Sequence, residues 1–289
     1  MARNINKKDE EGNTLLHRVL LGRDGVADEL RAMIPELAEI KPTTLVDLIK
    51  VLVDSGAKIN RRNGKGDTPL HIAVAKSSLK TIRSLLDLGA HINSQNREGF
   101  TPLHMAVDRN SADLLRMLVT AGADLNLRAL SDMYDRPEVT PLQYATILCK
   151  IHSFKALVDA GSDLNSVIIN GDTLLHLAIF CYNQPRRDDV IEIIDILLSK
   201  GVDEHLKNKQ GETPLHYAAV HNDRLIIQRL LQAGAEPRSL TNKGKTAFDL
   251  CEKNIKEMEK ICEKFKKEFD KFDKTPYLEC LDLLRIVES

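Results

Sequence analysis

The sequence lacks a surplus of charge and any long hydrophobic run. Its 289 residues carry 41 Lys and Arg against 42 Asp and Glu, a formal net charge of −1, which gives no global attraction to nucleic acid or to an anionic membrane. The longest stretch without a charged residue, Thr173 to Pro185, has thirteen residues, whereas a membrane helix needs about 20. The first eight residues contain no apolar segment typical of a signal peptide. We expect a cytoplasmic, intracellular protein that neither binds nucleic acid nor inserts into a membrane.

Cysteines and catalytic motifs are also sparse. The five cysteines are odd in number and widely scattered, which is typical of reduced thiols in an intracellular compartment. The sequence has no His-Glu-x-x-His, no Cys-x-x-Cys, no glycine-rich phosphate loop and no Gly-x-Ser-x-Gly. Cys149 and His152 could be a thiol and its base, but a structural thiol at a helix end is the favoured interpretation. We expect no enzyme activity, metal, cofactor or small-molecule substrate.

What the chain does contain is a repeated motif, Thr68-Pro69-Leu70-His71 in its most regular form. The Thr hydroxyl can cap a helix N-terminus, and Pro fits the first helical position, so each copy predicts a helix start after a polar turn. A Gly-Ala pair follows in phase, and several copies are 33 residues apart. The threonines are Thr14, Thr68, Thr101, Thr140, Thr173, Thr213 and Thr246, and the glycines are Gly56, Gly89, Gly122, Gly161, Gly201 and Gly234.

Between the two markers, the apolar pattern predicts a second helix in each repeat. Leu79, Ile82 and Leu85 recur at helical spacing and mark one buried stripe. Small alanines such as Ala73 and Ala106 occupy one position of the first helix, where a neighbouring repeat can approach closely. Because a single helix pair cannot bury its own stripe, we expect the repeats to stack.

These repeats resemble the ankyrin repeat, whose signature is a turn, a Thr-Pro-Leu-His helix start, a second helix and a Gly-Ala end. The resemblance covers about residues 4–250. It implies an all-α solenoid of helix-turn-helix pairs with β-hairpin fingers, followed by a C-terminal helical cap. We expect seven repeats, at about residues 4–60, 61–93, 94–126, 127–165, 166–205, 206–238 and 239–252, and a cap or tail at 253–289.

The resemblance also implies a non-enzymatic scaffold or inhibitor that binds partner proteins on the concave face formed by fingers and first helices. The positions beside each motif are expected to be exposed and to contact the partner, with Phe100, Ile168 and Ile169 as apolar anchors. Basic residues of two fingers interleave with acidic ones, which predicts a mixed polar surface. The candidate contact residues are Arg62, Lys65, Asp67, Arg97, Phe100, Ile168, Ile169, Asp172, Lys209 and Glu212.

Three insertions distinguish this chain from a regular array. Asp24 to Pro42 carries apolar residues at helical spacing and predicts an extra helix, whereas Asn183 to Asp189 is polar and predicts an exposed loop. The third insertion lengthens the finger at Leu127 to Val139 and places Met133 and Tyr134 near its tip. The two residues are candidate partner contacts, and the alternative is that Tyr134 folds back onto the adjacent finger.

After Thr246 the repeat pattern gives way to a Lys- and Glu-rich helix with an apolar seam. The seam follows a heptad-like spacing. It either caps the last repeat, whose apolar face needs cover, or is offered to a partner or to a second copy of the chain, in which case the protein self-associates. Its residues are Ile255, Met258, Cys262, Phe265, Phe269 and Phe272.

Two further patterns have a structural and a functional interpretation. Histidines of the repeated motif occur once per repeat, about 10 Å apart, which is too far for one metal ion, so we expect each to bond to its own threonine. Asn126 and Asn165 end runs that resemble the ankyrin-repeat pattern recognised by asparaginyl hydroxylases, and the structural alternative is an Asn that satisfies hairpin backbone groups.

Three classes of function therefore stay open. The first is the interaction scaffold or inhibitor. The second is an effector that an intracellular bacterium or a virus delivers to act on host proteins, in which case the protein works in the host-cell cytosol. The third is an adaptor domain of a larger protein.

Overall fold

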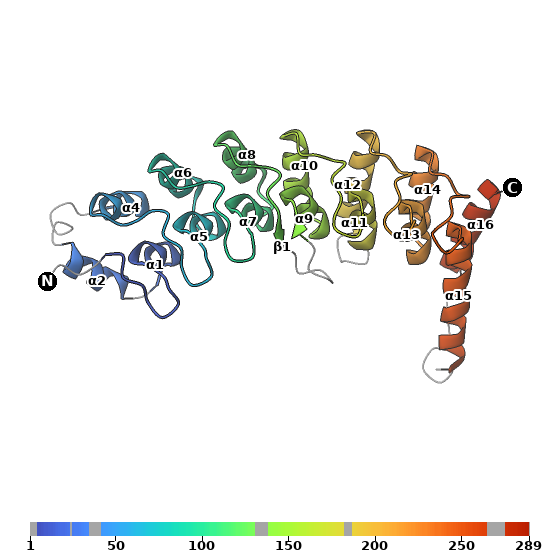
Figure 1. Cartoon of the computed structure of the whole chain (residues 1–289), viewed down its shortest axis with the longest axis horizontal. Coiled ribbons are helices and arrows are strands. Elements are labelled where there is room, and N and C mark those ends of the chain that lie inside the picture. Colours follow the sequence, from blue (N-terminus) through green and yellow to red (C-terminus); the bar gives the residue numbers. More distant parts are fainter. Residues whose placement is uncertain are drawn as a thin grey trace. The chain divides into compact units, whose positions relative to one another are not determined.

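The computed structural model describes residues 5–23, 25–34, 42–130, 138–181, 187–264 and 275–288. The chain divides into two compact units. Unit 1 comprises Met1–Ala145 and His152–Ser162, and unit 2 comprises Thr146–Ile151 and Asp163–Ser289. Both consist mainly of paired helices (Figure 1), which confirms the predicted all-α repeat fold.

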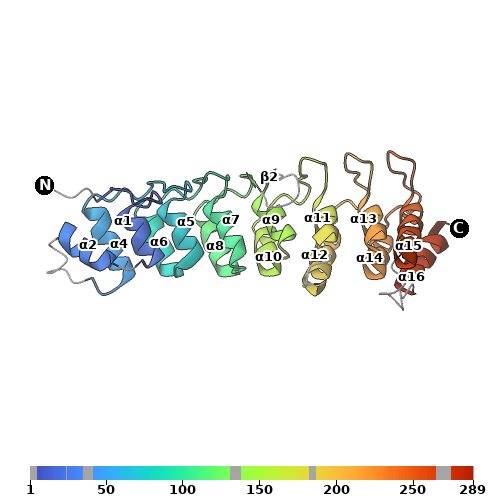
Figure 2. The ribbon, with the colours of Figure 1, turned by 90° about the horizontal axis from the view of Figure 1, so that it is seen from below.

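In unit 1 the first and second helices of the repeats form two rows (Figures 1 and 2). The first row contains α1 (Leu15–Leu21), α5 (Pro69–Lys76) and α7 (Pro102–Asp108), and the second contains α4 (Leu45–Asp54), α6 (Leu79–Asp87) and α8 (Ala112–Thr120). Most of α9 (Pro141–Ile147) and α10 (Ile151–Asp159) also belongs to unit 1.

Two insertions of unit 1 form the elements that the sequence predicts. The first contains α2 (Val26–Met33). The stem of the long finger is a two-stranded antiparallel sheet of β1 (Ala129–Leu130) and β2 (Glu138–Val139), with Ala129 opposite Val139.

Unit 2 continues the same pattern and ends in a longer helix pair. Its helices are α11 (Leu174–Phe180), α12 (Arg187–Ser199), α13 (Pro214–His221), α14 (Arg224–Ala233), α15 (Ala247–Lys264) and α16 (Thr275–Glu288). The loop predicted at Asn183 to Asp189 is already helical from Arg187. α15 has 18 residues against 8 in α13, so it extends about 15 Å further and passes beyond the row of α11 and α13 (Figure 1).

The predicted boundary between residues 252 and 253 lies inside α15, which is one continuous helix. α16 packs against α14 and α15. Its Cys280 and Leu284 are buried, and Arg224 forms a 3.1 Å ion pair with Glu279. The last helix pair of unit 2 is therefore α15 with α16.

The repeated histidines hold each first helix to the finger that follows it. In the third repeat the backbone N–H of Thr101 donates to Nδ1 of His104 (3.3 Å). Nε2 of His104 lies 3.1 Å from the carbonyl oxygen of Val139. Since a carbonyl only accepts, Nε2 carries the hydrogen. His17, His71, His176 and His216 make the same contacts, so the structural interpretation of these histidines is confirmed.

Successive fingers are also joined directly through their backbones. The amide of Gly64 donates to the carbonyl of Glu11 (2.8 Å), and the amide of Arg97 donates to the carbonyl of Lys65 (3.1 Å). In unit 2 the amide of Lys209 donates to Asn170 (2.9 Å). These bonds satisfy backbone groups that would otherwise need water and place finger side chains at defined positions. Figure 2 shows the fingers on one side of the helix pairs.

The close approach of two fingers explains one glycine, Gly66. Its φ is +84°, and a Cβ at this position would lie 2.7 Å from the backbone nitrogen of Arg97. Gly89 has a similar φ of +90°, but a Cβ at Gly89 would meet no atom within 4 Å. We expect Gly66→Ala to lower the free energy of unfolding by about 3 kcal/mol, because strain of the left-handed region adds to a steric clash.

Gly89→Ala is the matched control, since it carries the left-handed strain alone and is expected to cost about 1–2 kcal/mol. Urea unfolding followed by circular dichroism measures both variants. Equal losses would show that the contact between fingers does not restrict Gly66.

Candidate protein-interaction surface

The finger/first-helix face of each unit consists of the exposed finger residues that precede each motif threonine and the exposed end of the first helix. Five of the predicted contact residues are exposed there. They are Arg62, Lys65, Arg97, Ile169 and Lys209. Ile169 is the most exposed large apolar side chain of the described residues, at 70%, and Glu212 is half-buried.

Four predicted contact residues are not exposed, so the expectation that their side chains face solvent is wrong. Phe100 and Ile168 are buried, as are Asp67 and Asp172. Phe100 packs edge-on against Tyr144, with ring centroids 5.2 Å apart, and its carbonyl accepts from Nε2 of His71 (2.9 Å). The residue directly before the motif threonine is therefore buried against the next repeat at Asp67, Phe100 and Asp172, whereas Lys245, before Thr246, is exposed.

Ile168 is buried because its position faces the inside of the finger. Asn63 and Asn96 hold the equivalent place in other repeats. Their side-chain oxygens accept the backbone amides two and four residues later, at 2.9 Å in Asn63 and 3.0 Å in Asn96. In its own repeat, Ile168 fills this space with an apolar side chain.

The two buried aspartates link neighbouring fingers. Asn96 donates to Asp67 (2.9 Å), and Asn208 donates to Asp172 (2.8 Å). Tyr217 also donates to Asp172 (3.0 Å). Burial and then the charge of Asp172 raise the pKa of Tyr217, which keeps its hydroxyl protonated. Both carboxylates therefore hold fingers together within their own unit.

The remaining predicted contacts lie outside the described residues. Met133 and Tyr134 belong to the tip of the long finger, and Phe265, Phe269 and Phe272 belong to the tail seam. Met258 and Cys262 lie in α15, but their side chains are outside the described part of the chain. Ile255 is buried, which favours the cap interpretation at that position.

The sequence reasoning missed two apolar residues of this face, Phe180 and Val220. They are 50% and 43% exposed at the ends of α11 and α13. Each stands seven residues after its motif threonine, so counting from the motif could have found them. His221 packs against Phe180, with ring centroids 6.5 Å apart. The fingers of unit 2 add the exposed apolar side chains Val167, Leu206 and Leu240.

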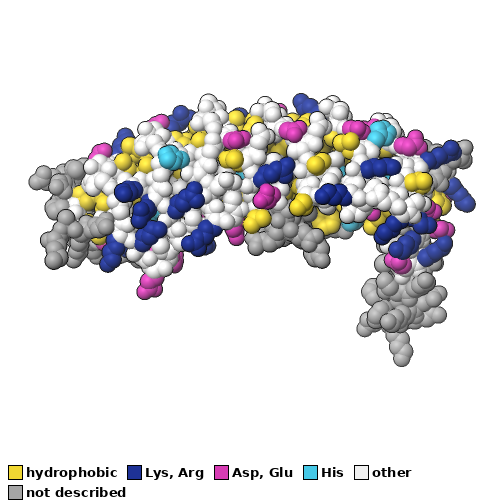
Figure 3. Space-filling view, in the orientation of Figure 1, with side chains coloured by type: hydrophobic (Ala, Val, Ile, Leu, Met, Phe, Trp, Pro, Cys, Tyr) yellow, Lys and Arg dark blue, Asp and Glu magenta, His cyan; other side chains and the backbone are white. Residues whose placement is uncertain are grey.

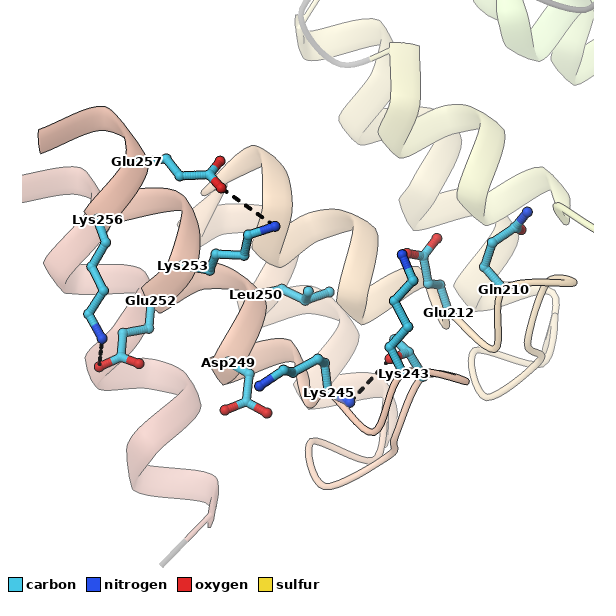
Figure 4. Close-up of a pocket in the computed structure, with 11 residues that line it drawn as sticks. Gln210, Glu212, Lys243, Lys245, Asp249, Leu250, Glu252, Lys253, Lys256 and Glu257 are labelled. Carbon is cyan, nitrogen blue, oxygen red and sulfur yellow. Dashed lines mark hydrogen bonds and ion pairs between the residues drawn. The ribbon is translucent and has the colours of Figure 1, made fainter. Parts of the chain in front are cut away.

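A hollow of about 680 Å³ lies on the same face of unit 2, between the last two fingers and α15 (Figure 4). Along α15, Lys253 pairs with Glu257 (3.5 Å) and Lys256 with Glu252 (3.0 Å). The hollow has a charged rim around Leu250. Its lining residues are Gln210, Glu212, Thr241, Lys243, Lys245, Asp249, Leu250, Glu252, Lys253, Lys256 and Glu257.

The candidate nucleophile does not have the environment of a reactive thiol. Cys149 is buried, whereas His152 is exposed. Burial and the nearby Cys149 raise the pKa of the Cys181 thiol to about 12, so this region disfavours thiolates. Asp203, Glu204 and His205 bring ligand atoms within 4.8 Å of one another, but they are successive residues of one finger and largely exposed to water.

Asn126 and Asn165 differ from the equivalent asparagines of earlier repeats. Asn60 donates to the carbonyl of Gly89 (3.0 Å) and accepts from the amide of His91 (2.8 Å), and Asn93 makes the same kind of contacts. The carboxamides of Asn126 and Asn165 are exposed and make no such bond to the described residues. Hydroxylation of these two remains a prediction, and an unbonded carboxamide is the easier one for an enzyme to reach.

None of the described helices is both long enough and apolar enough to cross a membrane.

The comparisons with known proteins agree with this architecture. A family model for ankyrin repeats, in three copies, matches residues 37–129 and 185–273. The putative ankyrin repeat protein FPV031 of Fowlpox virus (strain NVSL) is 40% identical over 103 residues, which cover 35% of this chain and 28% of that protein. The chain spans between 8% and 28% of the curated relatives it matches.

Two solved structures share the fold. The ankyrin repeat domain of Bcl-3, a member of the IkappaB protein family, aligns with a TM-score of 0.65 at 20% identity, covering 96% of this chain and 100% of that one. The human ASB11 ankyrin repeat domain aligns with a TM-score of 0.60 at 21% identity, covering 82% and 91%. With the matched family model, the repeated motif and the stacked helix pairs, the chain belongs to the ankyrin-repeat family.

Proposed function

We propose that this protein is a non-enzymatic scaffold or inhibitor that holds a partner protein against the finger/first-helix face. Ankyrin repeats are protein–protein interaction modules and are typically non-enzymatic. One observation carries the proposal: in the elements that form this face, unit 2 exposes Ile169 on a finger and Phe180 and Val220 at the ends of two first helices. Apolar side chains gathered at a solvent-facing site are characteristic of interaction surfaces.

The arrangement suits a small set of anchors in a polar rim. Burying a Val, Ile or Phe side chain contributes about 1.5–3 kcal/mol. Polar groups lie beside these anchors. Lys209 is next to the Ile169 finger, since its backbone amide donates to the carbonyl of Asn170 (2.9 Å). The charged hollow beside α15 includes Gln210 and Glu212 of the same finger as Lys209. Central apolar anchors with a polar surround supply most of the binding energy in protein interfaces.

The test replaces two anchors with charges. Affinity capture from a cell extract identifies the proteins bound by the intact chain, and biolayer interferometry then measures the affinity of the recovered partner. We expect the double variant Ile169→Asp, Phe180→Asp to weaken binding by about 1,000-fold, because each of the two anchors contributes roughly 2 kcal/mol.

Leu79→Asp is the matched control. Leu79 is 41% exposed but begins α6, a second helix, and so lies away from the fingers. It should bind like the intact chain. A double variant that keeps the full affinity for every captured partner would contradict the proposed surface.

A second candidate is an effector that a virus supplies to act on host proteins. The 40% identity to a fowlpox ankyrin repeat protein favours it. Expression in uninfected host cells, followed by capture of host proteins by the intact chain but not by the Ile169→Asp, Phe180→Asp variant, would support it, and capture of viral proteins alone would oppose it.

The proposed place of action is the cytoplasm. Cys149, Cys181, Cys251 and Cys280 are buried thiols that form no disulfide among the described residues, which supports a reducing compartment.

A further inference from the structure

Three successive fingers of unit 1 carry a concentration of positive charge. We call the exposed side chains of Lys7, Lys8, Arg61, Arg62, Lys65 and Arg97 the cationic finger patch. Figure 3 shows Lys and Arg side chains gathered over this part of the molecule. The patch is local, because the whole chain has a net charge of −1.

The cations of the patch are not neutralised by the part of the chain that the structure describes. None of the six forms an ion pair with a carboxylate of the described residues, whereas nearby Arg23 binds Glu11 and Asp9, and Arg18 binds Glu29. The acidic residue closest in sequence to Lys65, Asp67, is buried and bonded to Asn96. The positive charge of the patch is therefore available to a ligand.

The backbone holds like charges side by side in this patch. Arg97 and Lys65 are joined by the 3.1 Å bond from the Arg97 amide to the Lys65 carbonyl. The close packing at Gly66 also brings the Arg97 side chain against the neighbouring finger. Adjacent like charges are unfavourable, and an anion bound between them would relieve the repulsion.

The cations also follow the order of the repeats. Lys8 and Arg62 occupy the same position in successive fingers, six residues before the motif threonine. Each lies near the buried histidine of its own repeat, His17 and His71. Burial is the main cause that lowers the pKa of these histidines, and the charges of Lys8 and Arg62 act in the same direction. The spacing between repeats is roughly 10 Å, which is about three residues of an extended peptide.

We propose that the cationic finger patch of unit 1 binds an acidic, extended segment of a partner protein, with carboxylates about three residues apart pairing with successive fingers. The inference rests on the proposed protein-binding function and adds the chemistry of the partner. It also gives the two units different roles. The apolar anchors of unit 2 contact one part of the partner, and the cationic finger patch of unit 1 binds the partner's acidic segment.

The patch suits a peptide better than a polyphosphate chain. Exposed Glu10 and Glu98 stand on the same fingers and would repel an evenly charged backbone, whereas a peptide can place its carboxylates only opposite the cations. Base stacking needs exposed aromatic rings, but Phe100, the aromatic residue of the described part of these fingers, is buried.

The test uses a labelled peptide of about twelve residues that repeats Asp-Gly-Ser, which puts a carboxylate at every third position. Fluorescence anisotropy measures its binding to the full chain at low salt. We expect Lys65→Glu, Arg97→Glu to weaken binding by about tenfold or more, since two attractive pairs become repulsive. Raising the salt should also weaken binding, because these charges are exposed.

The matched control is Lys80→Glu, Arg83→Glu. Both side chains are exposed on α6, a second helix of unit 1 away from the fingers, and the variant has the same net charge as the first. It should bind the peptide within about twofold of the intact chain. Equal losses in the two variants, or no binding of the peptide to the intact chain, would overturn the inference.

Two further arms separate the alternatives. A single-stranded oligonucleotide or phosphatidylserine vesicles that bind more tightly than the peptide, and lose binding in Lys65→Glu, Arg97→Glu, would also overturn the acidic-peptide assignment. The Ile169→Asp, Phe180→Asp variant should bind the peptide normally. If the intact chain does not bind the peptide, this inference is rejected. The proposed function is rejected instead if the Ile169→Asp, Phe180→Asp variant still binds every captured partner.

Discussion

Acidification from about pH 7.5 to pH 5 is expected to destabilise the folded protein by several kcal/mol, because its buried histidines resist protonation. Burial lowers the pKa of all five motif histidines, which are His17, His71, His104, His176 and His216. For His104 the pKa falls to about 4. Its Nε2–H is already donated to Val139 and its Nδ1 accepts from Thr101, so a proton on Nδ1 would break the cap.

The sign of this pH effect depends on which state, folded or unfolded, binds its proton first as the pH falls. The unfolded histidine, with a pKa near 6.5, takes up its proton before the folded one as the pH falls. The stabilising contribution is therefore complete above about pH 6.5 and decreases between 6.5 and 4. At pH 5 the loss from His104 alone is about 2 kcal/mol, and the other four histidines act in the same direction.

The residue that occupies this histidine's position in the fourth repeat suggests the control variant. In the fourth repeat Gln143 holds the equivalent position, fully buried, and its Oε1 accepts from the amide of Thr140 (3.0 Å). We expect His104→Gln to keep the cap and to reduce the difference in unfolding free energy between the two pH values by about 2 kcal/mol. Urea midpoints at both pH values measure it, and an unchanged pH dependence would show that His104 does not titrate on unfolding.

Phe154→Ala is expected to cost about 3–5 kcal/mol of unfolding free energy. Phe154 lies in α10 of unit 1 and is fully buried, the largest such side chain in the described core. Removing its ring loses the transfer free energy of the aromatic group and leaves a cavity that tightly packed neighbours fill only in part.

Phe180→Ala makes the same chemical change at a side chain that is 50% exposed and should cost less than about 1 kcal/mol. Thermal and urea unfolding compare the two variants. If Phe154→Ala lost as little unfolding free energy as Phe180→Ala, α10 would contribute little to the core. Loss of partner binding by Phe180→Ala, without loss of stability, would separate the interaction face from the core.

The repeated motif predicted the fold well, because each copy acts on nearby residues and the chain contains several copies. Thr68 caps a helix, Pro69 begins it and Ala73 lets the next repeat approach, whatever the rest of the chain does. The same signal predicted that the histidines bond to their own threonines. It also predicted the extra helix α2, since apolar spacing within one segment is enough to define a helix.

The candidate site was harder to predict from single positions. Phe100 and Ile169 were both expected to be exposed, yet Phe100 is buried and Ile169 is 70% exposed. The difference is that Phe100 directly precedes its motif threonine and meets Tyr144 of the next repeat, whereas Ile169 stands three residues further out on its finger. Phe180 was missed because the apolar end of a helix looks like core until its neighbours are known.

By itself, the sequence determined the ankyrin-repeat fold, the helix starts and the structural role of the histidines, because caps, turns and apolar stripes act within a few residues. Only the tertiary structure decided which finger side chains face solvent and which of their charges stay unpaired. Those properties depend on the neighbouring repeat: the bond from Arg97 to Lys65 and the packing of Phe100 on Tyr144 join residues about thirty or more positions apart. The motif thus specifies the scaffold, and contacts between repeats specify the surface.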